Sequence, residues 1–204
     1  MSEEKIFFPS EGLKIEGLLH QSTGEGAVVV THPHPLYGGN MHNNVVLSII
    51  NAYQQSGYTT LRFNFRGIGL SEGSHCQGIG EQEDVRSALT YLTGLGKTSV
   101  DLAGYSFGSW VNALGLTGFD TIENLIMVSP PVAFIDFSFL GYNPKIKLVI
   151  AGSNDDIAPP SMIEKMLPTW NQEAEFRIIP GIDHFYWGGT NEVEEIIRSF
   201  LDRA

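Results

Sequence analysis

The sequence has few of the features that mark secreted, membrane or nucleic-acid-binding proteins. It contains a single cysteine, Cys76, so no disulfide can form within the chain, which is typical of a reducing compartment. Its aliphatic runs, such as 45–50, are far shorter than the roughly 20 residues that span a bilayer. Residues 1–5 are acidic and no long apolar run follows them, so we expect no signal peptide and a cytoplasmic location.

Positive charge is also scarce, with 12 Lys and Arg against 23 Asp and Glu and a net charge of −11. Nucleic-acid binding depends on clustered Lys and Arg, and anionic membranes attract the same residues. We therefore expect neither a nucleic-acid partner nor a membrane partner. The length of 204 residues and the 42% hydrophobic content predict one domain, 1–204, with a sizeable core.

The chain does contain an alternation of apolar runs and helical periodicity. A hairpin of two short strands is expected over 5–20, turning near residues 11 and 12. Further strands are expected at 27–31, 59–65, 99–103, 125–129, 147–151 and 176–179. Helical spacing over 45–53 predicts a helix ended by Gly57, and helical spacing over 85–92 predicts one that stops at Gly94. Further helices are expected at 107–116, 160–167 and 193–201, with Asn191 as the N-cap of the last. This order predicts an α/β protein with a mostly parallel central sheet and helices on both faces.

One pentapeptide, Gly104-Tyr105-Ser106-Phe107-Gly108, lies between a predicted strand and a predicted helix. That context is the one required by a G-x-S-x-G nucleophile elbow, in which a sharp turn exposes the serine above the sheet edge. The flanking glycines have no side chain to clash in so tight a turn. The motif therefore predicts a nucleophilic serine, Ser106.

A serine hydroxyl becomes a strong nucleophile when a histidine, oriented by a carboxylate, accepts its proton. His184 is the one histidine after Ser106 and follows the last predicted strand. Asp155 and Asp156 follow the strand before it, and we favour Asp155 because it comes directly after the turn at the strand end. Asp183 adjoins His184, but it lies on the wrong side of the loop for the acid.

An oxyanion hole needs two backbone N–H groups directed at the developing charge. Phe107, the residue after the serine, is expected to supply one. The loop 32–40 is expected to supply the other, and because Pro33 and Pro35 have no N–H, the donors left open are His34, Leu36 and Tyr37.

With these motifs, the chain resembles the α/β-hydrolase superfamily, in particular small and nearly lidless bacterial hydrolases related to dienelactone hydrolases and serine esterases. The resemblance is carried, in order, by 32–39, 63–69 with 71–73, the Ser106 elbow, 152–159 and 183–185. It implies an α/β-hydrolase fold and an acid three residues after Gly152, which is Asp155. The short interval 130–144 implies a minimal lid, and we expect Tyr37, Phe134 and Phe185 to line the substrate pocket.

The sequence therefore predicts a serine hydrolase acting on a small-molecule acyl substrate, most simply a carboxylic ester. A peptidase, amidase or thioesterase is the alternative on the same three residues, and a non-catalytic binding protein is the alternative of another class. Neither a cofactor nor a metal is expected, because His32, His34, His42 and His75 have no carboxylate or cysteine at ligand spacing. The sequence is also compatible with a homodimer.

Overall fold

The computed structural model describes residues 2–203, and within them eight strands form one sheet. The strands are β1 (Glu4–Ser10), β2 (Leu13–His20), β3 (Gly26–Thr31), β4 (Thr59–Phe63), β5 (Ser99–Tyr105), β6 (Ile122–Val128), β7 (Ile146–Gly152) and β8 (Glu175–Ile179). Their spatial order is β1-β2-β4-β3-β5-β6-β7-β8. The pairs β1–β2 and β2–β4 are antiparallel, and all pairs from β4 to β8 are parallel.

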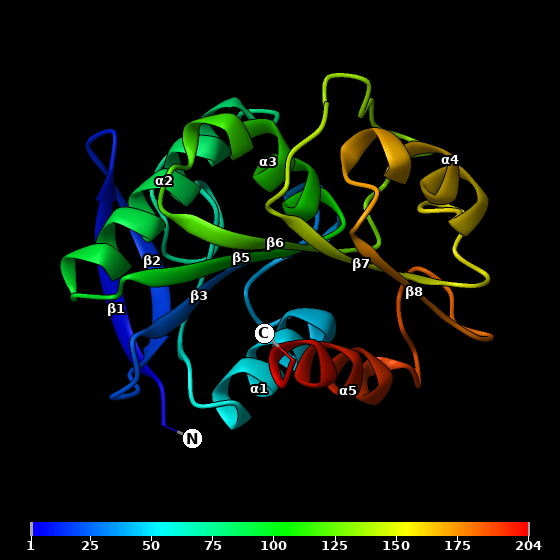
Figure 1. Ribbon diagram of the computed structural model, residues 1–204. Coiled ribbons are helices and arrows are strands. Elements are labelled where there is room, and N and C mark those ends of the chain that lie inside the picture. The colour runs from blue at the N-terminus through cyan, green and yellow to red at the C-terminus, as the bar shows by residue number, and fades with distance from the viewer. Residues whose placement is uncertain (1, 204) are drawn as a thin grey trace.

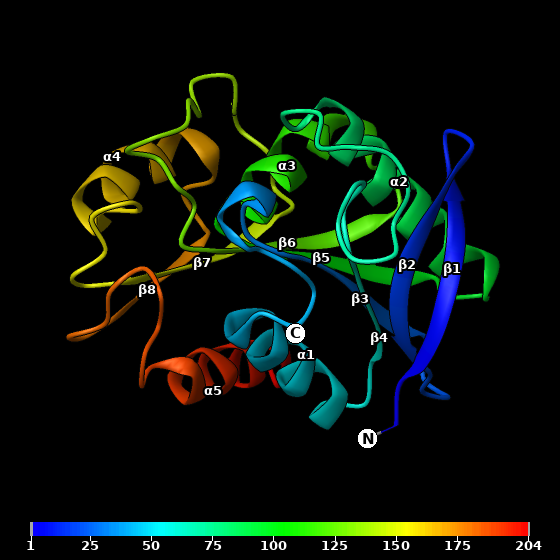
Figure 2. The same cartoon turned by 180° about the vertical axis from the view of Figure 1, so that it is seen from behind.

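Helices cover both faces of this sheet. They are α1 (Asn44–Gln55), α2 (Ile79–Gly94), α3 (Phe107–Gly115), α4 (Pro160–Trp170) and α5 (Thr190–Leu201), with short 3-10 turns η1 (Pro35–Tyr37) and η2 (Leu116–Gly118). Figure 1 shows α2, α3 and α4 on one face and α1 and α5 on the other, and Figure 2 shows the same layers from behind. The predicted α/β class and mostly parallel sheet are confirmed.

The strand β3 shows why the apolar runs are continuous rather than alternating. Val28 and Val30 pack in the core beneath α1 and α5, whereas Ala27 and Val29 pack in the core on the opposite face. A parallel strand covered by helices on both sides must be apolar at every position. Each residue of this run is therefore buried, with alternate side chains serving different cores.

Two helices show how far their ends could be predicted. The helix α2 ends at Gly94, as predicted, and begins at Ile79, before the apolar pattern that starts at Val85, because the Glu81 carboxylate accepts the N–H of Gly78 (2.8 Å) and caps a mostly polar first turn. The prediction that Asn191 caps α5 is wrong. The N-cap is Gly189, whose carbonyl accepts the N–H of Val193 (3.4 Å), so Asn191 lies inside the first turn.

Candidate active site

The turn between β5 and α3 holds Ser106 in a strained conformation. Its φ of 53° and ψ of −120° lie outside the regions that residues with a Cβ normally occupy. The surrounding structure enforces this geometry, since the Ser106 N–H donates to the carbonyl of Val128 on β6 (2.9 Å) and its carbonyl accepts the N–H of Ser109 (3.0 Å). The hydroxyl is thereby placed at the carboxyl end of the parallel strands, where ligands of such sheets bind.

The two glycines of the elbow are required by close packing. A Cβ on Gly104 would lie 2.5 Å from Thr31 Oγ1, and a Cβ on Gly108 would lie 2.6 Å from the same atom. Neither glycine has a positive φ, so conformational freedom is not the reason for their presence. The prediction that the turn leaves no room for side chains at these positions is confirmed.

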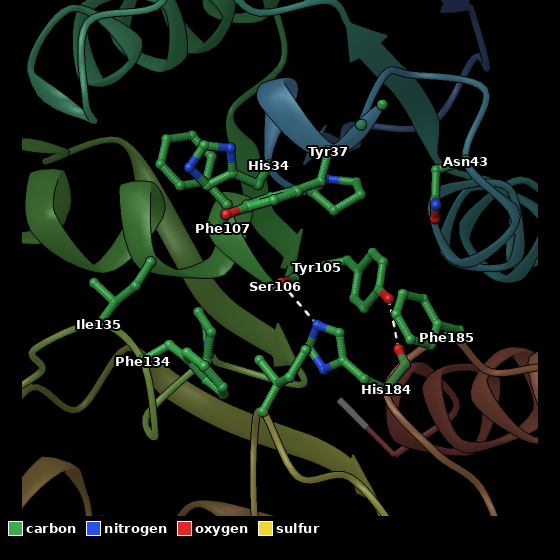
Figure 3. Close-up of a pocket in the computed structure, with 15 residues that line it drawn as sticks. His34, Tyr37, Asn43, Tyr105, Ser106, Phe107, Phe134, Ile135, His184 and Phe185 are labelled. Atoms are coloured by element: carbon green, nitrogen blue, oxygen red, sulfur yellow. Dashed lines mark hydrogen bonds between the residues drawn. The ribbon is translucent and has the colours of Figure 1, made fainter.

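His184 lies in the loop after β8 and joins Ser106 to Asp155. Its Nε2 atom is 2.9 Å from Ser106 Oγ, and its Nδ1 atom is 2.9 Å and 3.0 Å from the two carboxylate oxygens of Asp155. Tyr105 also donates its hydroxyl to the His184 carbonyl (2.5 Å), which attaches this loop to the end of β5. Figure 3 shows both bonds as dashed lines, one from Ser106 to the His184 ring and one from the Tyr105 hydroxyl to His184. The structure therefore brings together the three side chains that the sequence proposed for the site.

Asp155 is 2% exposed, yet it is surrounded by donors. Besides His184 it accepts the hydroxyl of Ser129 (2.7 Å) and the N–H groups of Ile157 (2.9 Å) and Ala158 (2.7 Å). Burial raises the pKa of the Asp155 carboxyl, but the hydrogen bonds from His184, Ser129 and Ala158 outweigh burial and hold the pKa below its usual value. Asp155 is therefore ionised at neutral pH and keeps a proton on Nδ1 of His184.

The other two aspartates that were weighed for the acid point elsewhere. Asp156 is exposed, and the exposed Asp183 uses its carboxylate to accept the N–H of Phe185 (2.9 Å) within the turn. Of the three, only Asp155 hydrogen-bonds His184 in the described chain.

Sequence reasoning missed two residues behind Asp155. Ser129 follows β6 and donates to Asp155, and its Oγ also lies 2.7 Å from the hydroxyl of Tyr186. Both residues have a positive φ, 45° for Ser129 and 57° for Tyr186, and both are fully buried. The signal available for Ser129 was its place at a strand end, since β6 lies next to β5 and ends at the same edge of the sheet.

In the loop after β3, hydrogen bonds distinguish the three candidates for the second oxyanion donor. The Leu36 N–H donates to His34 Nδ1 (3.2 Å), and the Tyr37 N–H donates to the His34 carbonyl (3.1 Å). The His34 N–H makes no hydrogen bond within residues 2–203. His32 anchors the loop, since its Nε2 accepts the Phe65 N–H (3.1 Å). Burial lowers the pKa of His32 to about 4, so its ring is neutral.

A cavity of about 570 Å³ opens above Ser106. Its wall includes all three predicted pocket residues, and these are largely exposed: Tyr37 by 88%, Phe134 by 74% and Phe185 by 57%. Figure 3 shows them around Ser106 and His184. None of the residues that line this cavity is Asp, Glu, Lys or Arg. The site therefore offers no formal charge to a ligand except through its histidines.

The described residues contain neither a cluster of metal ligands nor a helix that could cross a membrane. Across residues 2–203, no group of three or more His, Cys, Asp or Glu side chains is placed to hold a metal ion. In the same residues, every helix is too short or too polar to cross a bilayer.

Known proteins with similar sequences and structures span nearly the whole chain. An uncharacterised protein of Rickettsia prowazekii is 34% identical over 97% of this chain and 88% of its own length. An α/β serine hydrolase homologue from Coxiella burnetii is 30% identical over 98% of both chains, with a TM-score of 0.90. A lidless α/β serine hydrolase from Xanthomonas campestris is 27% identical, with a TM-score of 0.91 over 100% of this chain and 95% of its own. No protein-family model matches the chain.

The chain belongs to the α/β-hydrolase superfamily. In this hydrolase the crossover from β6 to β7, residues 129–145, consists of turns and contains no helix. The expected minimal lid is confirmed. No helical cap covers the cavity in the described chain, and the aromatic side chains of Tyr37, Phe134 and Phe185 form part of its wall.

Proposed function

We propose that this hydrolase is a serine carboxylesterase that acts on small neutral acyl esters through an acyl-enzyme. The observation that carries the proposal is the 2.9 Å contact between Ser106 Oγ and His184 Nε2, with the opposite ring nitrogen held by an ionised Asp155. This arrangement directs the basic nitrogen of a neutral imidazole at the serine hydroxyl.

In the proposed reaction, Ser106 Oγ attacks the acyl carbon while His184 Nε2 accepts the hydroxyl proton. The N–H groups of Phe107 and His34 stabilise the oxyanion, because of the three loop candidates only His34 has an N–H that makes no hydrogen bond within residues 2–203. The ester C–O bond then breaks, and His184 gives its proton to the departing alcohol. Water, deprotonated by His184, attacks the acyl-enzyme and releases the acid and Ser106.

The composition of the cavity wall favours a substrate without formal charge. Binding a carboxylate, a phosphate or an ammonium group in this cavity would remove its water without supplying an opposite fixed charge. The aromatic side chains of Tyr37, Phe134 and Phe185 offer flat apolar surface instead. An uncharged acyl or aryl ester satisfies both conditions.

The proposal is tested first by fluorophosphonate labelling followed by intact-mass measurement, which requires no knowledge of the substrate. We expect one adduct on the wild-type protein and none on Ser106→Ala. Ser138→Ala is the matched control, because Ser138 is an exposed serine of the 129–145 segment and hydrogen-bonds only Asp136 within the described residues. Labelling of this control should equal that of the wild type.

A panel of oxyesters, thioesters and anilides then separates the reactions that the same residues could perform. We expect oxyesters to give the highest kcat/KM and Ser106→Ala to lower kcat on the order of 10⁴–10⁶-fold. A preference for thioesters or anilides would replace the esterase by a thioesterase or an amidase. A folded wild type that forms no adduct would indicate a binding protein that keeps the hydrolase fold.

A further inference from the structure

The side chain of His34 forms a second histidine site on the cavity wall, separate from His184. Its ring lies against three other rings, with centroid distances of 4.7 Å to Phe107, 5.1 Å to His75 and 5.1 Å to Tyr37. Figure 3 shows His34 and Phe107 together on the side of the cavity opposite His184. The position of the ring is therefore set by packing before any substrate binds.

Hydrogen bonding also determines which ring nitrogen of His34 carries the proton. Because the Leu36 N–H donates to Nδ1 (3.2 Å), Nδ1 is an acceptor and the neutral ring has its proton on Nε2. Burial and the nearby His75 lower the pKa of His34, and Glu81 opposes them only in part. The Nε2 atom makes no hydrogen bond within residues 2–203.

The ring of His75, on which His34 packs, lies next to a buried carboxylate. His75 Nδ1 lies 2.9 Å from Glu81 Oε1, although not in line for a hydrogen bond. The fully buried Glu81 carboxylate accepts the N–H groups of Cys76 and Gly78, both at 2.8 Å. These two bonds fix the position of Glu81 beside the His75 ring.

His34 lines the cavity above Ser106, so its ring can contact a bound substrate. The proposed oxyanion donors are the main-chain N–H groups of Phe107 and His34, whereas the imidazole packs on the side chain of Phe107. A donor in this position can bind a substrate atom that takes no part in bond breaking. Because the cavity wall carries no Asp, Glu, Lys or Arg, this donor can distinguish between neutral substrates. A substrate without an acceptor at this position displaces the water that was bonded to Nε2–H and leaves the donor unpaired, which weakens binding.

We propose that His34 Nε2–H binds a second oxygen on the substrate, so that the preferred substrates are neutral esters with an additional ketone or ether oxygen. This inference rests on the proposed esterase function. His34 is then a specificity-determining residue through its side chain, in addition to the oxyanion donor that its main chain supplies.

Two variants of His34 separate the ring's two hydrogen bonds while keeping the main-chain N–H. His34→Asn keeps an acceptor near Nδ1 for the Leu36 N–H, and asparagine is a favoured residue at the N-cap that His34 occupies before η1. It removes the distal donor. His34→Gln places an amide N–H near the position of Nε2 and removes the proximal acceptor. A purely structural role for the ring would favour the Asn variant, and the proposed role favours the Gln variant.

The assay compares 4-nitrophenyl esters of equal chain length, with and without a ketone or ether oxygen at successive positions of the acyl chain. A second series varies the alcohol of a common acid in the same way. In at least one pair we expect the wild type to favour the oxygen-bearing ester by roughly 3- to 10-fold in kcat/KM, the effect of one neutral hydrogen bond. His34→Asn should abolish this preference, and His34→Gln should retain part of it.

Fluorophosphonate labelling of the same variants distinguishes the two levels of the proposal. All three proteins should form the Ser106 adduct, and absence of the adduct from the wild type would overturn the esterase function itself. If labelling occurs, a wild type that treats every pair equally would overturn the role of His34. A preference that survives in His34→Asn would overturn it as well.

Discussion

Two buried aspartates at opposite edges of the sheet have pKa values shifted in opposite directions. Asp155 follows β7 at the carboxyl edge and is 2% exposed, and Asp101 lies near the start of β5 at the amino edge and is also 2% exposed. The pKa of Asp155 is held below its usual value, whereas burial raises the pKa of Asp101 to about 6. Equal burial therefore does not decide the direction of the pKa shift.

The donors around each carboxylate explain the difference. Asp101 accepts two neutral side-chain groups, the hydroxyl of Tyr53 (2.9 Å) and the amide of Asn124 (2.7 Å). Asp155 accepts two backbone N–H groups, one hydroxyl and the ring of His184. A carboxylate that loses its water keeps a low pKa only when enough hydrogen bonds replace that water. The carboxyl edge of the sheet supplies these bonds because the segments that follow β6, β7 and β8 each contribute donors to Asp155.

Among changes to the two carboxylates and their donors, the largest effect is expected from Asp155→Asn, which makes the site carboxylate neutral. The Asn amide would donate to His184 Nδ1, so that Nε2 keeps the proton and cannot accept one from Ser106. We expect kcat to fall about 10³–10⁴-fold, measured with the best ester of the panel. Asp156→Asn, at the exposed neighbour, should retain wild-type kcat. Equal losses in the two variants would contradict the assigned role of Asp155.

A smaller effect, on stability and not on activity, is expected from Asp101→Asn. The fold raises the pKa of Asp101 from 3.8 to about 6, so the native protein binds this proton more tightly than the unfolded chain does. The Asp101 contribution to the free energy of unfolding should therefore fall as pH rises from about 4 to about 6, by on the order of 2–3 kcal/mol.

The measurement is urea unfolding of the wild type and Asp101→Asn at several pH values, with the difference between the two plotted against pH. The exposed Asp120→Asn serves as the control and should follow the wild type. A difference between wild type and Asp101→Asn that does not change with pH would show that the fold does not raise the pKa of Asp101.

The smallest effect is expected from Ser129→Ala, which removes one donor from Asp155 and brings its surroundings closer to those of Asp101. The pKa of Asp155 should rise, and the more basic carboxylate should move the acid limb of the kcat/KM profile to higher pH. We expect a loss in kcat/KM on the order of tenfold. Tyr186→Phe keeps the bond from Ser129 to Asp155 and should lose less. A shift of equal size in both variants would assign the effect to general loosening of the site.

Much of the fold could be predicted because its signals are local. The apolar run Val28–Val30 predicts a buried strand without any knowledge of its neighbours in space. The helical spacing of the apolar residues in α1 likewise predicts a helix from the local sequence. The start of α2 could not be predicted, because it depends on the capping of Gly78 by Glu81 in a polar turn without apolar periodicity. The cap of α5 was misassigned because Asn191 also suits a place in the first turn.

The sequence by itself determined the class of the protein and the candidate nucleophile, base and acid, because motif, chain order and strand ends restrict where Ser106, His184 and Asp155 can lie. Only the tertiary structure decided which of three loop amides stays without a partner, and only it revealed Ser129 behind Asp155. The first question concerns hydrogen bonds within the short turn 34–37, and the second concerns a bond between two separate strand ends. Whether such a bond forms depends on differences of a few tenths of an ångström in the donor–acceptor distance and on the bond angle. Residue types and their spacing in the sequence do not specify these quantities.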